Sequence, residues 1–194
     1  MKPIPQKTVL KKLSTLGILV GIACLPLSSG AGEGRVTLEA IQKRFDHVKT
    51  FKAKFTQKAY VKILNQTQKS EGVVYIKKPG KMKWTYRNPE PQVLISNNKT
   101  LWLYLPEDKQ ATKTSIKDIY TSNTPALFLS GKGKLAESFK LIKITPGPPL
   151  AVVLIPKQKD QGIDRLVLMI DNKNYQIIGS QVYDKLGNRT DILF

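Results

Sequence analysis

The chain has 194 residues, a length that fits one domain with a sizeable hydrophobic core. It holds 32 Lys and Arg against 14 Asp and Glu, which gives a formal net charge of +18, and it has one cysteine and one histidine. A single Cys and a single His exclude an internal disulfide and a Cys/His zinc site. The positive charge suggests an anionic partner, such as a phospholipid surface, nucleic acid or an acidic protein, unless the lysines only solvate the wet faces of strands.

The first 30 residues have the pattern of a secretory signal. Four lysines precede an apolar run, Leu13–Leu27, which is followed by the small residues of Ser28–Ala31. Because the run is shorter than the roughly 20 apolar residues that span a bilayer, we interpret residues 1–30 as a cleaved signal peptide. Cys24 lies inside this run. Its lipidation is an alternative, but Gly21 stands where a lipoprotein signal usually has Leu.

The remaining residues, 31–194, are predicted to form one domain that begins with a helix. From Val36 to about Thr50 the apolar residues recur at helical spacing, and Thr37 is suited to the N-cap position. The single histidine, His47, falls on the polar side, where a surface residue is expected rather than a ligand or a base. The apolar stripe consists of Leu38, Ile41, Phe45 and Val48.

Strands follow the helix. Phe51–Val61 alternates apolar and polar residues, and a turn is predicted at Asn65–Lys69. The stretch Gly72–Gln110 alternates again and predicts a meander of at least four antiparallel strands. Three clusters of Pro, Gly and Asn mark its turns: Lys78–Gly80, Asn88–Pro91 and Asn97–Asn98.

The last third contains a short helix and further strands. Thr124 before Pro125 and a closing Gly131 predict the helix. Five strands are then predicted, at Phe139–Ile144, Leu150–Ile155, Ile163–Ile170, Tyr175–Tyr183 and Arg189–Phe194. With ten or eleven strands and two or three helices, we expect a mainly β (α+β) fold: a strongly curved, incompletely closed antiparallel β-barrel or half-barrel whose concave face is covered by helices.

Three stretches resemble the periplasmic outer-membrane lipoprotein carriers, the LolA family. They are Phe51–Gln57 behind an amphipathic helix, the Gly72–Gln110 meander with its Lys-Pro-Gly and Asn-Pro turns and its Leu101–Tyr104 strand, and Asn123–Leu129. The resemblance covers Val36–Phe194. It implies a periplasmic chaperone that binds the acyl chains of lipoproteins in a hydrophobic cavity and carries them from the inner to the outer membrane.

The resemblance also implies a binding site. Together with the alternation, it predicts nine lipid-binding residues: Ile41, Phe45, Val48, Phe51, Met82, Trp84, Val93, Ile95 and Leu127. In the family, Asn123–Leu129 would belong to a lid, and a basic residue, normally Arg, pins the lid helices. Lys78 occupies that position here, and it is therefore the expected latch, although Lys lacks the planar fork of Arg.

The implied partners are acylated lipoproteins, an ATP-driven releasing complex in the inner membrane and an acceptor in the outer membrane. We expect a monomer without a cofactor and without a nucleic-acid partner. One departure is that family members usually continue with a further loop and strand carrying Phe and Pro, whereas this sequence ends at Phe194.

Two other function classes are weaker. The sequence has no nucleophile elbow, no His-Glu-x-x-His and no phosphate loop, so we expect no enzyme. A related periplasmic binder of lipids or apolar ligands in another envelope pathway remains an alternative. A basic nucleic-acid-binding β-domain would fit the charge and the aromatic strands, but the export signal argues against it.

Overall fold

The computed structural model describes residues 37–115, 134–158 and 162–194. All of them lie in one compact unit, Val36–Phe194, which is distinct from Met1–Arg35. The predicted signal peptide and the predicted helix at 125–131, with Leu127, lie outside the described residues. Among the residues that are described, no helix has the length and apolar character that crossing a bilayer demands.

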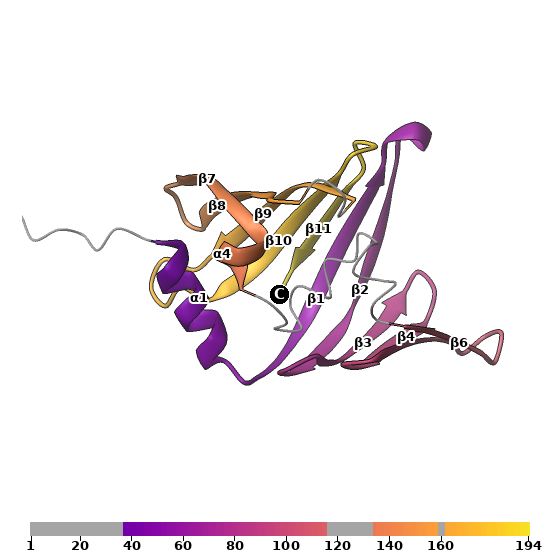
Figure 1. Cartoon of the computed structure of the whole chain (residues 1–194). Helices are drawn as coiled ribbons and strands as arrows, with labels where there is room; N and C mark the ends of the chain where they lie inside the picture. Colours follow the sequence, from indigo (N-terminus) through magenta and orange to yellow (C-terminus); the bar gives the residue numbers. More distant parts are fainter. Residues whose placement is uncertain (1–36, 116–133, 159–161) are drawn as a thin grey trace, which may run out of the picture. The chain divides into compact units, whose positions relative to one another are not determined.

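The described residues form one antiparallel sheet of eleven strands (Figure 1). The strands are β1 (Thr50–Val61), β2 (Gln66–Lys77), β3 (Lys81–Asn88), β4 (Gln92–Asn97), β5 (Thr100–Leu105), β6 (Gln110–Ser115), β7 (Phe139–Thr145), β8 (Leu150–Pro156), β9 (Ile163–Ile170), β10 (Ile177–Asp184) and β11 (Arg189–Leu193). Their order is β6-β5-β4-β3-β2-β1-β11-β10-β9-β8-β7, so β6 and β7 are edges and the sheet does not close. The predicted curved and open antiparallel sheet is confirmed.

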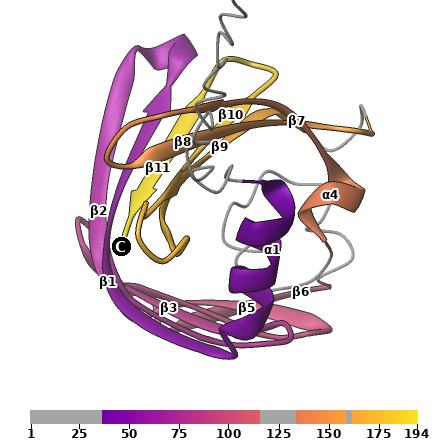
Figure 2. The ribbon, with the colours of Figure 1, turned by 90° about the vertical axis from the view of Figure 1, so that its left-hand side faces the viewer.

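Two α-helices of the described residues lie on the open side of this sheet. They are α1 (Leu38–His47) and α4 (Leu135–Ser138), and in Figure 2 the sheet curves around them from β7–β10 to β3–β6. The Thr37 hydroxyl accepts the Ala40 N–H at 3.1 Å, as predicted for an N-cap. The backbone N–H of Leu135 donates to Gln42 Oε1 at 2.7 Å, which joins the two helices.

Cross-strand register gives β1–β6 two faces of opposite character. Because side chains alternate along a strand, residues paired across neighbouring strands share a face. The strands β1–β6 contain no charged residue on the inner face, which turns toward α1. One row across this face consists of Ala53, Val74, Trp84, Leu94 and Leu103.

The prediction that Val93 and Ile95 lie on the concave side with Met82 and Trp84 is wrong. Trp84 pairs with Leu94, so Leu94 faces inward, while Ile95 lies on the opposite face and is 40% exposed. The run Val93–Ile95 is apolar without interruption, and a one-residue change of phase turns every side chain to the other face. Ser96 turns inward because its hydroxyl donates to the Gly80 carbonyl at 2.9 Å.

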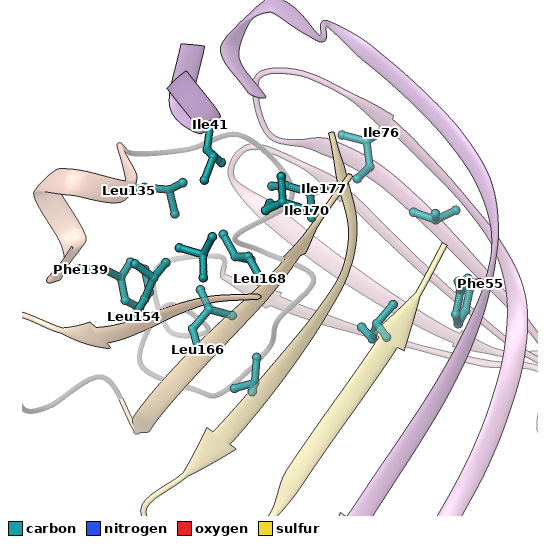
Figure 3. Close-up of a cluster of buried hydrophobic side chains, with 14 of the residues drawn as sticks. Ile41, Phe55, Ile76, Leu135, Phe139, Leu154, Leu166, Leu168, Ile170 and Ile177 are labelled. Atoms are coloured by element: carbon teal, nitrogen blue, oxygen red, sulfur yellow. The ribbon is translucent and has the colours of Figure 1, made fainter. Parts of the chain in front are cut away.

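Most of the buried hydrophobic side chains belong to the two helices and to the second half of the sheet, β7–β11. Ile41 of α1 and Leu135 of α4 are buried, and Figure 3 shows them directed toward the strands that carry Leu154, Leu168 and Ile170. Ile41, predicted to bind lipid, is fully buried in this hydrophobic core.

Two turns differ from the predicted positions. The turn expected at Asn65–Lys69 is instead a 3₁₀ turn, η1 (Lys62–Leu64), closed by Asn65 in the left-handed region at φ 48°. The turn after β9 extends to residue 176, because Asp171 and Gln176 are joined by a backbone hydrogen bond of 2.9 Å. The helix α4 was not predicted, since four residues carry no periodicity.

Gly72 is essential to the approach of β2 to β3. A Cβ on Gly72 would lie 2.0 Å from the Thr85 carbonyl oxygen and 2.9 Å from the Phe55 ring. We expect Gly72→Ala to lower the free energy of unfolding by about 1–3 kcal/mol, measured by urea unfolding. Ser70→Ala, on the same strand and face, should change it by less than about 0.5 kcal/mol. Equal effects would contradict the close approach.

Candidate functional site

An apolar cavity of about 50 Å³ lies beneath the C-terminal end of α1. Its lining comes from both halves of the sheet, which only the curvature brings together. The apolar side chains around it are Phe45, Val48, Phe51, Ile76, Ile177 and Phe194. A volume of 50 Å³ is far below the roughly 300 Å³ of a small-molecule site, so a ligand of that size does not fit the cavity in this structure.

The structure brings together four of the predicted site residues at this cavity: Phe45, Val48, Phe51 and Lys78. Met82 and Trp84 lie on the inner face of β3, both buried, and extend the same apolar surface toward β4.

Sequence reasoning missed Ile76, Ile177 and Phe194, which also line the cavity. The sequence did contain a signal for Ile76: the predicted hairpin pairs it with Met82, so the two side chains share a face. Ile177 and Phe194 had no local signal, since they reach the cavity from β10 and the chain end by way of the pairing between β1 and β11.

The inner face carries a set of aromatic rings in edge-to-face contact. The Phe55 ring centroid lies 4.8 Å from that of Trp84 and 5.0 Å from that of Tyr86, and the Phe51 and Phe194 centroids are 5.2 Å apart. Such pairs contribute about 0.5–1.5 kcal/mol each beyond their burial. Burial raises the pKa of Tyr86 to about 12, so its phenol stays neutral, and its hydroxyl donates to Gln57 Oε1 at 3.2 Å.

Lys78 connects the β2–β3 turn to the end of α1. Its Nζ donates to the Phe45 carbonyl and lies 3.1 Å from the centroid of the Phe45 ring, and its backbone N–H donates to the Lys49 carbonyl at 2.9 Å. Carbonyls in the last turn of a helix lack intrahelical partners, and a cation is favoured at that end of the helix dipole. Lys78 therefore supplies both a donor and a charge where α1 needs them.

This position lowers the pKa of Lys78 to about 8. Burial is the largest cause, because a charged ammonium loses hydration there. Asp46 raises the pKa and Lys49 lowers it, as smaller contributions. At neutral pH the Lys78 ammonium is thus a charged but partly desolvated donor.

The site's chemistry is that of an apolar hollow whose lining also includes three basic side chains, those of Arg44, Lys49 and Lys78. Across residues 37–115, 134–158 and 162–194 no group of three or more His, Cys, Asp or Glu side chains could hold a metal ion. Apolar walls with few polar groups suit a ligand that is itself largely hydrocarbon.

Comparison with known proteins identifies the family. Residues 46–194 match the family model described as outer membrane lipoprotein carrier protein LolA. The outer-membrane lipoprotein carrier protein of Azotobacter vinelandii is 33% identical over 178 residues, covering 91% of this chain and 84% of that protein. The carrier of Hahella chejuensis is 30% identical and covers 95% and 86%.

Among solved structures, a putative outer membrane lipoprotein-sorting protein domain from Vibrio parahaemolyticus aligns with a TM-score of 0.48 and 14% identity, covering 80% of this chain and 88% of that one. The family assignment comes from the sequence matches and does not depend on this alignment. On the extent and identity of those matches, the chain belongs to the LolA family of outer membrane lipoprotein carriers.

Proposed function

We propose that this chain carries lipoproteins through the periplasm by holding their acyl chains between the inner face of β1–β5 and the helix α1. The observation that supports this most is the uncharged inner face of β1–β6, next to a cavity that Phe45, Val48 and Phe51 line. An acyl chain of roughly 14 methylenes gains on the order of 10 kcal/mol when it leaves water. Lipoproteins with such chains need a protein of this kind to cross an aqueous compartment.

The carrier works by moving α1. In the closed structure the cavity of about 50 Å³ is too small for a chain, so binding must lift the helix off the β1–β2 wall. Among the described residues, two hydrogen bonds oppose this, from Lys78 Nζ to the Phe45 carbonyl and from the Leu135 N–H to Gln42, and so does the packing of Ile41. The lipid-binding set is then Phe45, Val48, Phe51, Met82 and Trp84, with Ile41 exposed as α1 moves.

The cellular route follows from the same proposal. The chain is exported through residues 1–30, and residues 31–194 act as a monomeric domain without a cofactor and without catalysis. It receives lipoproteins from an ATP-driven releasing complex in the inner membrane and delivers them to an acceptor in the outer membrane. A purified mature chain should release a labelled lipoprotein from inner-membrane vesicles in the presence of that complex. Binding of free fatty acids or phospholipid without such release would favour a lipid binder of another envelope pathway.

The two tryptophans report directly on where acyl chains bind, because they lie on opposite faces of the sheet. Trp84 is buried on the inner face, and Trp102 pairs with Ile95 on the outer face. A diacylated lipopeptide with brominated acyl chains should quench the fluorescence of Trp102→Phe, which keeps Trp84. It should leave Trp84→Phe, which keeps Trp102, almost unchanged. Quenching of Trp102 alone would refute binding on the inner face.

Lys78→Leu tests the latch. A hydrogen bond to a charged group contributes about 1.5–3 kcal/mol, so its loss should favour the open, cargo-bound state by about tenfold or more. We expect the variant to retain bound lipoprotein and to transfer less of it to the acceptor in a timed transfer assay. Lys77→Leu is the matched control, since Lys77 is exposed on the outer face and should transfer normally. Unchanged transfer by Lys78→Leu would remove the latch role.

The lowered pKa of Lys78 gives a pH signature. The folded state releases this proton near pH 8, whereas the unfolded chain keeps it to about 10.5. Between these values the unfolded state binds more protons, so this group makes stability rise with pH, and it has no such effect below pH 8. The free energy of urea unfolding should therefore rise from pH 8 to 10 in the wild type relative to Lys78→Leu. A difference that stays constant over that range would contradict the buried position.

A further inference from the structure

The outer face of β1–β6 is strongly basic. These six strands contain nine Lys or Arg residues and a single acidic residue, Glu71, whose carboxylate accepts a bond from Asn88 at 2.9 Å. The strands β7–β11 hold four basic and three acidic residues, so the charge is concentrated on one half of the sheet. By register, all eight lysines of β1–β6 lie on the face opposite to Trp84 and Leu94.

Large apolar side chains stand exposed among these lysines. Tyr75 is 44% exposed, Ile95 40% and Tyr104 41%, and Lys52 Nζ lies 5.2 Å from the centroid of the Tyr75 ring. An open depression of about 510 Å³ runs past Tyr75 and Ile95. One continuous row across the strands consists of Lys52, Tyr75, Lys83, Ile95, Trp102 and Lys113.

We propose that this basic outer face, defined by that row and its neighbours, docks on the surface of an anionic phospholipid bilayer. Tyr and Trp prefer the boundary between headgroups and hydrocarbon, and lysines extend to the phosphates around them. A bilayer is fluid, so it needs no deep complementary pocket, and the face offers only a shallow depression. The docking is separate from the acyl-chain site on the inner face and does not depend on it.

Two features favour a bilayer over other polyanions. Eight of the nine basic residues are lysines, which act as point charges, whereas sites that read individual phosphates or carboxylates favour the planar fork of Arg. Ile95, exposed at the centre of the row, gains from contact with acyl chains and gains nothing from a phosphate backbone or an acidic peptide.

The number of lysines on this face determines the strength of membrane binding and its dependence on salt. A basic residue near an anionic membrane contributes about 1 kcal/mol, and this falls off within a Debye length of about 10 Å at 0.1 M salt. Several lysines held on one face therefore give reversible binding that weakens steeply as salt rises. Such binding concentrates the protein at the membrane surface without anchoring it.

The test measures binding to vesicles in the absence of any lipoprotein. The mature protein should sediment with vesicles of phosphatidylcholine containing about 30% phosphatidylglycerol, should not sediment with pure phosphatidylcholine, and should be released as salt rises from about 50 to 200 mM. Brominated lipid in these vesicles should quench Trp102 in the Trp84→Phe variant and leave Trp84 unquenched in Trp102→Phe.

A matched pair of triple variants assigns the surface. Lys52→Gln/Lys83→Gln/Lys113→Gln should reduce partitioning at least tenfold. Lys140→Gln/Lys143→Gln/Lys173→Gln removes the same charge from exposed positions elsewhere and should retain binding. Circular dichroism and the unfolding midpoint should be unchanged in both, since every substituted side chain is exposed.

Three outcomes would overturn the proposal: no salt-dependent binding to the anionic vesicles, equal losses in the two triple variants, or binding of a single-stranded oligonucleotide or polyglutamate through these lysines while vesicles do not bind. None of these outcomes affects the acyl-chain proposal. Failure of lipopeptide quenching at Trp84 likewise leaves the vesicle result intact.

Discussion

The register of β1–β6 is the constraint on which the rest of the structure depends. Because side chains alternate strictly along each strand, a single phase places Trp84 and Leu94 toward α1 and places Ile95 and the lysines on the opposite face. A shift of one residue would bring lysines into the interior, where an unpaired charge is costly. Gly72 maintains this register physically, since only its missing side chain lets the Thr85 carbonyl approach.

The helix α1 bridges the two halves of the sheet with contacts of different kinds. Near its start, Ile41 is fully buried in the hydrophobic core that includes residues of β8–β10. At its end, Phe45 covers a small void and is held through Lys78 of the other half. The packed contact resists movement because it would leave a cavity, whereas the polar contact exchanges readily with water. The void therefore lies under the end of α1 that is easier to lift, which is where an acyl chain would begin to enter.

Features of the fold and the site that depend on residues close together in the sequence could be predicted, and features that depend on residues far apart in the sequence could not. The start of α1 at Thr37 and the turn at Lys78–Gly80 are local, and the sequence predicted both. The predicted orientation of the β4 side chains was wrong because Val93–Ile95 contains no polar residue that would indicate which side faces solvent. The next polar residue, Ser96, faces inward, where its hydroxyl donates to the Gly80 carbonyl. Ile177 and Phe194 join the cavity through pairings more than a hundred residues apart in the chain, which no local pattern encodes. Lys78 drew attention through family resemblance rather than through any physical pattern.

The lysine at position 78 determines how many hydrogen bonds this side chain can make to the end of α1. The Lys78 ammonium donates to a single α1 carbonyl, that of Phe45, and lies over the ring of the same residue. A guanidinium would offer five donors in a fixed plane and would hold several carbonyls of a helix end together. A carrier must keep its apolar site closed to water when it is empty and must still open for its cargo. Each hydrogen bond that opening breaks raises the free energy needed to open the site. With one bond and a partly desolvated charge, Lys78 stabilises this position of α1 only modestly. Under the mechanism we propose, a smaller gain from acyl-chain burial would then suffice to move the helix.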